Sequence, residues 1–319
     1  MTYSAGNTIV DDDYNIFATG NAAGSGDQSV ANINSVLGLG GNEFGYGQSS
    51  TLPPVTAPNL VQASEWTNLL TRNATLASHQ GTSITGISNP SAGDTIAAYA
   101  ALSANVTATF NGKLNAAASG SDITRTTSTT TSWNTSSVLT QTVTFPSRNE
   151  LRYFFNAGGM IRCNWSRTGG TGSSQNTSWS DTLTAAGTIV LTSDGASKTI
   201  AGTSYTGTTK LGGSGTNQIL LTGSGIYDVS STPTIFFKQI PPTGYGDNEI
   251  EYYFSIPSEG TVLTIKTDLS DDYTPPDPGS PDLVDGTLTQ TLVVRLPSTT
   301  HLTDTWGTPV ISSNSWVQS

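Results

Sequence analysis

Residues 138–145, Val-Leu-Thr-Gln-Thr-Val-Thr-Phe, carry the pattern that decides the fold of this chain. Leu139, Val143 and Phe145 stand at odd positions, whereas threonines occupy most of the even positions. A hydrophobic period of two is typical of a β-strand that buries one face, because successive side chains point to opposite sides. The spacing changes from helical to strand-like near Ser137, so we predict β-structure from there to the C-terminus.

Short apolar runs separated by turn signals continue through the C-terminal half. Asp194-Gly195, Gly212-Gly213, Pro241-Pro242 and Asp285-Gly286 separate successive runs, and Asn156 to Gly159 is predicted to be the turn of a hairpin. This spacing favours a β-sandwich-like region over 137–319, either as one domain or as two subdomains, 137–230 and 231–319. The predicted strands after the first are 151–155, 160–165, 188–191, 198–200, 219–221, 234–239, 250–256, 261–268 and 287–296.

The N-terminal part has a different character. We predict an arm over 1–26, a helical docking and oligomerisation region over 27–112, and a polar linker or extended exposed segment over 113–136. The predicted helices cover 30–37, capped by Asp27 and ended by Gly38; 63–80, with Gly81 as C-cap; and 95–110, capped by Asp94. The fold class is therefore mainly β, with β-sandwich-like structure after a short arm and a small helical region.

The predicted helices are amphipathic but short, so they must bury their apolar faces on each other or on other copies. We therefore predict that these faces dock the chain to neighbours. The candidate interface residues are Val30, Ile33, Trp66, Leu69, Leu70, Ile96 and Tyr99.

Charged residues make up 11% of the 319 residues, against roughly 25% in average soluble proteins. Threonine, serine, glycine and asparagine replace them, which suits permanent contact with copies of the same chain. The net charge is −11, and the most basic stretch, 148–167, is interleaved with aromatics, so we expect no nucleic-acid partner. Because no stretch approaches 18 apolar residues, we expect no membrane insertion, and the N-terminus shows no secretory signal.

Few residues are candidates for catalysis or metal binding. The single cysteine, Cys163, is predicted to be a small core residue, and His79 and His301 lack the spacing of metal ligands. The acidic runs 11–13 and 271–272 are predicted to be solvated turns, with a calcium loop as the alternative. Glu249 and Glu251 face the same side of a predicted strand, where a solvent-facing pair is favoured over a catalytic pair. We therefore predict no enzyme activity, no cofactor and no metal.

Aromatic residues offer a different functional hypothesis. Trp165 and Trp179 lie among serine, threonine and asparagine, where exposed rings stack on sugars or fill interface pockets. The alternative is that both are core residues of a sheet. We keep them as candidate contacts for a glycan or a partner protein.

Several segments resemble virion structural proteins of tailed bacteriophages. The central one is 152–162, Arg-Tyr-Phe-Phe-Asn-Ala-Gly-Gly-Met-Ile-Arg, in which an aromatic strand, a turn and a second strand are expected. Similar segments occur, in order, over about half of the chain. They are 3–9, 11–15, 77–81, Thr168-Gly169-Gly170, Asn176-Thr177-Ser178-Trp179, Asp271-Asp272 and Val284-Asp285-Gly286-Thr287-Leu288.

The resemblance implies a structural component of the tail, neck or fibre apparatus that docks by its N-terminal half and projects a β-rich region. The expected partners are the chain itself, as a trimer or higher homo-oligomer, and other virion proteins. The expected location is the virion, assembled in the cytoplasm of the host bacterium. Two alternatives stay open: a receptor-binding fibre module that recognises host surface glycan, and a capsid decoration protein.

Overall fold

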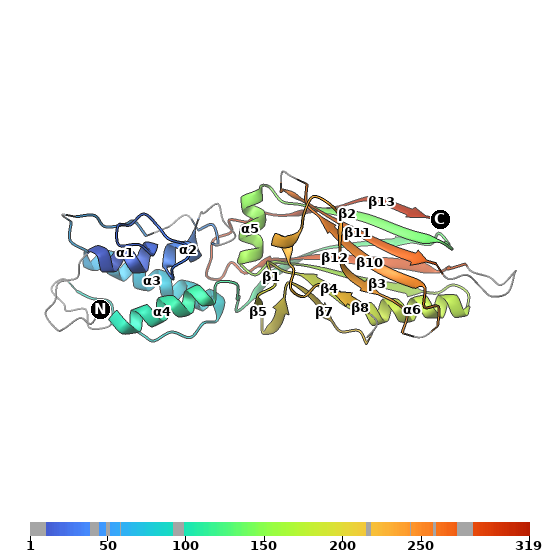
Figure 1. Cartoon of the computed structure of the whole chain (residues 1–319), viewed down its shortest axis with the longest axis horizontal. Helices are drawn as coiled ribbons and strands as arrows, with labels where there is room; N and C mark the ends of the chain where they lie inside the picture. The colour runs from blue at the N-terminus through green and yellow to red at the C-terminus, as the bar shows by residue number, and fades with distance from the viewer. Residues whose placement is uncertain are drawn as a thin grey trace.

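The computed structural model describes residues 11–38, 45–48, 52–57, 59–91, 99–214, 218–242, 244–257, 260–272 and 283–319, the side chains of 313 and 314 excepted. Over these residues the molecule is elongated, with helices at one end and a β-sandwich at the other (Figure 1). Strands take up 34% and helices 26%, which confirms the mainly β fold class. None of the helices in these ranges is long and apolar enough to cross a lipid bilayer.

Two antiparallel sheets form the sandwich. The five-stranded sheet has the order β1 (Ser119–Thr129), β12 (Thr287–Pro297), β3 (Met160–Thr168), β4 (Thr188–Leu191) and β7 (Thr208–Leu211). The six-stranded sheet has the order β13 (Val310–Gln318), β2 (Ser136–Thr144), β11 (Val262–Asp271), β10 (Asn248–Ser255), β9 (Thr234–Gln239) and β8 (Gln218–Leu220). A hairpin of β5 (Ser197–Ile200) and β6 (Thr203–Thr206) makes a separate two-stranded sheet.

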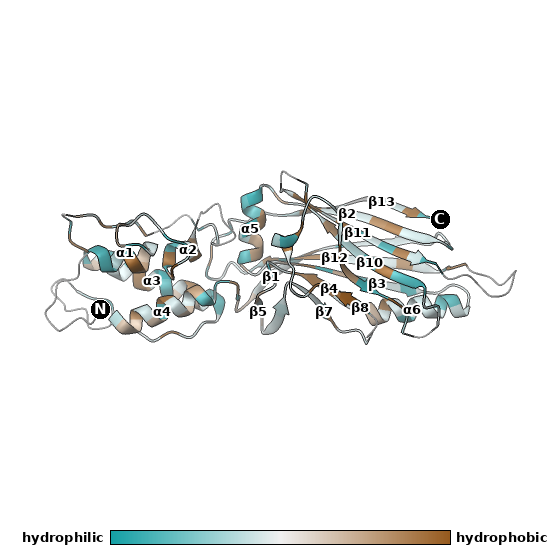
Figure 2. Cartoon of the chain, viewed as in Figure 1, coloured by the Kyte–Doolittle hydropathy of each residue, from teal (hydrophilic) through white to brown (hydrophobic). Residues whose placement is uncertain are grey.

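The period-two pattern has the predicted effect on β2. Leu139, Gln141 and Val143 are buried, whereas the residues between them are partly exposed. Bands of different hydropathy follow one another along the strands in the same way (Figure 2). The two sheets meet through their inner faces: the rings of Trp165 on β3 and Trp316 on β13 are 5.6 Å apart and nearly perpendicular.

The helical end consists of α1 (Asp11–Thr19), α2 (Ile33–Leu37), α3 (Ala63–Gln80) and α4 (Tyr99–Asn111), packed around a shared core. The predicted limits of α3 are confirmed, and Gly81 ends it in a left-handed conformation, with φ of 68°. Asn32, rather than the predicted Asp27, caps α2, because its side chain accepts from the backbone N–H of Ser35. The predicted start of the last helix, with Asp94, lies outside the described ranges.

The predicted arm is wrong for most of its described residues, and the segment predicted as a linker contains an extended, largely exposed strand. Residues 11–19 form α1, where Tyr14 and Phe17 are buried in the core of the helical end. The acidic run 11–13 is the first turn of this helix, a position that the helix dipole favours for carboxylates, so it is not a solvated turn. Residues 119–129 form β1, because a polar strand at the edge of a sheet needs only one ladder of backbone hydrogen bonds.

The β-rich half contains two helices that the sequence did not predict. Residues 151–155 belong to α5 (Arg148–Asn156), not to a strand, so the hairpin predicted around 156–159 is also wrong. Ser147 caps α5 by accepting from the N–H of Glu150, and residues 151–156 are all buried, which hides the helical period. The second helix is α6 (Ser174–Ala186), which lies along one side of the sandwich (Figure 1). A short 3-10 turn, η1 (Ile226–Asp228), lies between β8 and β9.

Candidate functional site

Most of the predicted docking residues are buried inside this chain. Ile33, Trp66 and Leu69 are at most 3% exposed and belong to the core of the helical end. Leu70 is also buried, and Tyr99 is half-buried against the ring of Phe17. The prediction that these side chains form an open docking surface is therefore wrong, because the four helices cover one another. Val30 is 40% exposed and remains a surface residue, and Ile96 lies outside the described residues.

The predicted glycan contacts are buried as well. Trp179 on α6 is 1% exposed and packs edge-on against Trp133, with ring centres 4.9 Å apart. Trp165 is 5% exposed and packs against Trp316. The interpretation of both as exposed sugar or partner contacts is wrong, and the alternative of core tryptophans is confirmed. Cys163 is also a core residue, as predicted.

A short segment, residues 45–48, joins the helical end to the sandwich; we call it the junction segment. On the helical side, the N–H groups of Tyr46 and Gln48 donate to the carbonyl oxygens of Val36 (3.0 Å) and Leu37 (2.8 Å). On the sandwich side, the side chain of Gln48 both donates to and accepts from the backbone of Thr303, each at 3.0 Å. The junction segment therefore bonds to both ends of the molecule.

Tyr46 is the fully buried centre of the junction segment. Its hydroxyl donates to the carbonyl oxygen of Lys113 (2.6 Å) and accepts from the side-chain amide of Gln80 (3.1 Å). Next to it, Gly47 has φ of 68°, and a Cβ there would lie 2.4 Å from the ring of Tyr153 on α5. The sequence gives only a faint signal for this arrangement, a tyrosine between two glycines.

His79 lies against the junction segment near the end of α3. Its ring centre is 5.1 Å from that of Tyr46, and the side chain is 2% exposed. Burial lowers the pKa of His79 to about 4, since a charged imidazolium would lose its hydration; a hydrogen bond to the backbone of Ala157 opposes the effect, and the charge of His301 adds to it.

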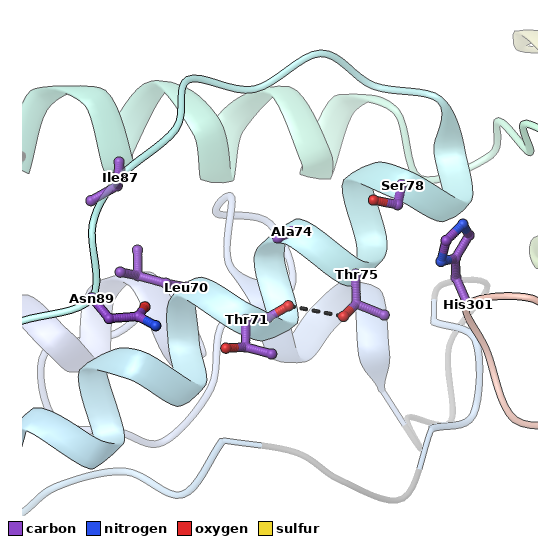
Figure 3. Close-up of a pocket in the computed structure, with 8 residues that line it drawn as sticks. All are labelled: Leu70, Thr71, Ala74, Thr75, Ser78, Ile87, Asn89 and His301. Carbon is purple, nitrogen blue, oxygen red and sulfur yellow. Dashed lines mark hydrogen bonds between the residues drawn. The ribbon is translucent and has the colours of Figure 1, made fainter.

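A groove of about 360 Å³ runs along α3 beside His301 (Figure 3). The hydroxyls of Thr71 and Thr75 donate to carbonyl oxygens one turn earlier in the helix, at 2.8 and 2.9 Å. It is lined by Leu70, Thr71, Ala74, Thr75, Ser78, Ile87, Asn89 and His301.

At the other end of the sandwich, Asp285 connects three segments, and we call this group the Asp285 cluster. The carboxylate accepts from the N–H (3.0 Å) and hydroxyl (3.1 Å) of Thr171 and from the side-chain amide of Asn176. Arg167 makes an ion pair with it at 3.5 Å. The hydrogen bond from Asn176, followed by those from Thr171, lowers the pKa of Asp285. Asn176 also accepts from the N–H of Asp285, so the contact is reciprocal.

Glu249 and Glu251 lie on β10 and share one cation. The ammonium group of Lys238 on β9 pairs with Glu249 and, at 3.5 Å, with Glu251. Burial acts to lower the pKa of Lys238, but the two carboxylates outweigh it and leave the pKa raised. The hydroxyl of Tyr253 donates to Glu251 at 2.6 Å. Each carboxylate is therefore held in an ion pair on the sheet. Glu251 is only 8% exposed, so the predicted solvent-facing position is wrong for this residue.

Among the residues that the structure describes, no three His, Cys, Asp or Glu side chains are arranged to hold a metal ion. No protein-family model, curated protein or solved structure matches this chain.

Proposed function

We propose that this chain is a structural subunit of a tailed-bacteriophage virion, located in the tail, neck or fibre apparatus. The observation that carries the proposal is the Asp285 cluster. Three of the segments in which the sequence resembles such virion proteins, 168–170, 176–179 and 284–288, are separated by up to about a hundred residues. In the fold, Asn176 and Asp285 bond to each other and to Thr171, which directly follows the first segment.

This convergence supports the resemblance, because chance matches would not be expected to meet in one hydrogen-bonded unit. The shape of the molecule agrees with a mechanical role, since a helical end and a sandwich are joined in a line by the bonds of the junction segment. The low content of charged residues agrees with permanent contact between subunits.

In this proposal the helical end attaches to the particle and the sandwich projects from it. The attachment surface is the exposed apolar part of the helical end, which includes Leu60 (65% exposed) and Val30 (40% exposed). The predicted docking residues that are buried in this end act indirectly, by holding that surface in shape. The chain joins copies of itself and other virion proteins, and its place is the assembled virion.

Particles purified from cells that carry the gene test the proposal. Quantitative mass spectrometry should find the chain at a fixed copy number per particle, and gold-labelled antibodies should mark the tail, neck or fibres in electron micrographs. The Leu60→Lys variant should fold but be depleted from particles, whereas Ile219→Lys, at a residue of the sandwich that is 53% exposed, should be incorporated normally. Absence of the wild-type chain from purified particles would refute the proposal.

A further inference from the structure

The described strands end the two large sheets at four edges, and three of these edges are protected against pairing with another chain. β7 and β8 have only four and three residues, and β1 carries Asp122 and Arg125. Short length and charged side chains are the usual means by which sheet edges avoid adding a further strand. β13 differs, because it has nine residues and none is charged.

The neutral surface extends beyond β13. Its neighbour β2 also has no charged residue, whereas the next three strands of the same sheet, β11, β10 and β9, carry Lys238, Glu249, Glu251, Lys266 and Asp268. Two copies of a chain with net charge −11 repel each other on approach. An edge formed by β13 and β2 is a place where two copies can meet without bringing like charges together.

A β-bulge gives β13 two exposed valines on one face. Val310 and Val317 pair with Thr144 and Val138 of β2, which are six positions apart, while the bulge between Ser313 and Ser315 adds one residue to β13. Because six is even, both valines point to the outer face of the sheet. Each is 58% exposed, and they stand near opposite ends of the strand.

We propose that β13 is a self-association edge, through which two copies of the chain pair antiparallel and continue the six-stranded sheet from one copy into the other. A two-fold axis perpendicular to the sheet keeps the outer faces of both copies on the same side, and this axis makes the strands antiparallel. Both copies contain the extra residue of the bulge, so the paired strands have equal lengths. β13 lies along the margin of the sandwich, where a second copy has access to it (Figure 1).

The register follows from matching side chains. Centring the axis on the bulge places Val310 opposite Val317 of the second copy, Ile311 opposite Trp316 and Ser312 opposite Ser315. Apolar residues then face apolar residues and hydroxyls face hydroxyls, in two symmetric sets. This pairing depends on the β13 edge alone, so it holds or fails independently of the proposed virion function.

Paired charge variants test both the edge and the register by sedimentation equilibrium of the full chain. Val310→Lys with Val317→Lys places lysine opposite lysine and should weaken the dimer at least tenfold. Val310→Glu with Val317→Lys places opposite charges together and should restore it. The first variant makes the net charge less negative, from −11 to −9. General repulsion between copies therefore decreases and cannot explain a loss of dimerisation. Ile219→Lys with Ser231→Lys changes the charge equally at exposed positions on the opposite side of the sheet from β13, and this matched control should dimerise like the wild type.

Disulfide formation measures the register directly. A mixture of the Ser312→Cys and Ser315→Cys variants should give a covalent heterodimer under mild oxidation, because these positions are opposite each other and directly opposite Cβ atoms are about 5 Å apart. Each variant alone should cross-link poorly, and the native Cys163 is buried and will not interfere. Circular dichroism confirms that each variant is folded. A wild-type chain that stays monomeric at high concentration, or cross-links that join identical positions, would overturn the proposal.

Discussion

The helical end and the sandwich bury their apolar residues in different ways. In the helical end, four amphipathic helices cover each other. Their aromatic and aliphatic faces are therefore buried within one chain. In the sandwich, two sheets cover each other's inner faces, but the outermost strands keep an unpaired row of backbone groups. Among the described residues, a strand edge and a few exposed side chains therefore stay open to solvent, rather than a helical face.

The largest expected effect concerns the connection between the two ends. Tyr46→Ala removes a fully buried ring and its two hydrogen bonds, which should cost about 3–5 kcal/mol of the free energy of unfolding. It should also split one denaturation transition into two, as the ends lose their shared contacts. Tyr46→Phe, which keeps the ring, should cost about 1–2 kcal/mol and keep a single transition. An unchanged midpoint in urea for Tyr46→Ala would show that the ends are independent.

The next effect is a pH dependence centred on His79. The folded pKa is about 4, below the ordinary value of 6.5, so the unfolded chain takes up a proton first as the pH falls. Stability should therefore decline between pH 6.5 and 4, by up to about 3 kcal/mol. His79→Gln should remove this part of the pH profile measured by urea denaturation, whereas His301→Gln should leave most of it. Equal slopes for wild type and His79→Gln would contradict the prediction.

The Asp285 cluster should matter less, because it lies near the surface. Asp285→Asn should lower the melting temperature at pH 7, where the carboxylate is charged and holds Thr171 and Asn176. Its folded pKa is lowered, so this stabilisation is complete above the ordinary aspartate pKa of about 3.9 and is lost as the pH falls below it. Calorimetry at pH 7 and 3 should show the difference shrinking. A constant difference would mean that packing, not charge, accounts for it.

The smallest expected effect concerns the access of reagents to the space between the two sheets. Cys163 is buried between the sheets, and burial raises the pKa of its thiol. A thiol reagent should therefore react with the native chain only as fast as the chain opens, and at once with the chain in denaturant. Rapid reaction of the native chain would show that the inner faces are accessible.

Local sequence patterns predicted the elements whose two sides differ. The limits of α3 and the alternation along β2 were both predictable, because each has one buried face and one exposed face. Residues 151–155 were mistaken for a strand because every residue in this part of α5 is buried, so no period distinguishes it from a buried strand. Nothing local marks residues 119–129 as β1, since its partner β12 is more than 150 residues away in the sequence.

The sequence by itself determined that this chain is mainly β, with an N-terminal helical region and a cysteine in its core. It determined these features because the direction of side chains along a strand or helix depends on neighbouring residues. The tertiary structure alone decided which aromatic residues are exposed, which segments meet at Asp285 and Tyr46, and which sheet edge stays open. Burial and edge position depend on segments far apart in the chain, so no local pattern could specify them.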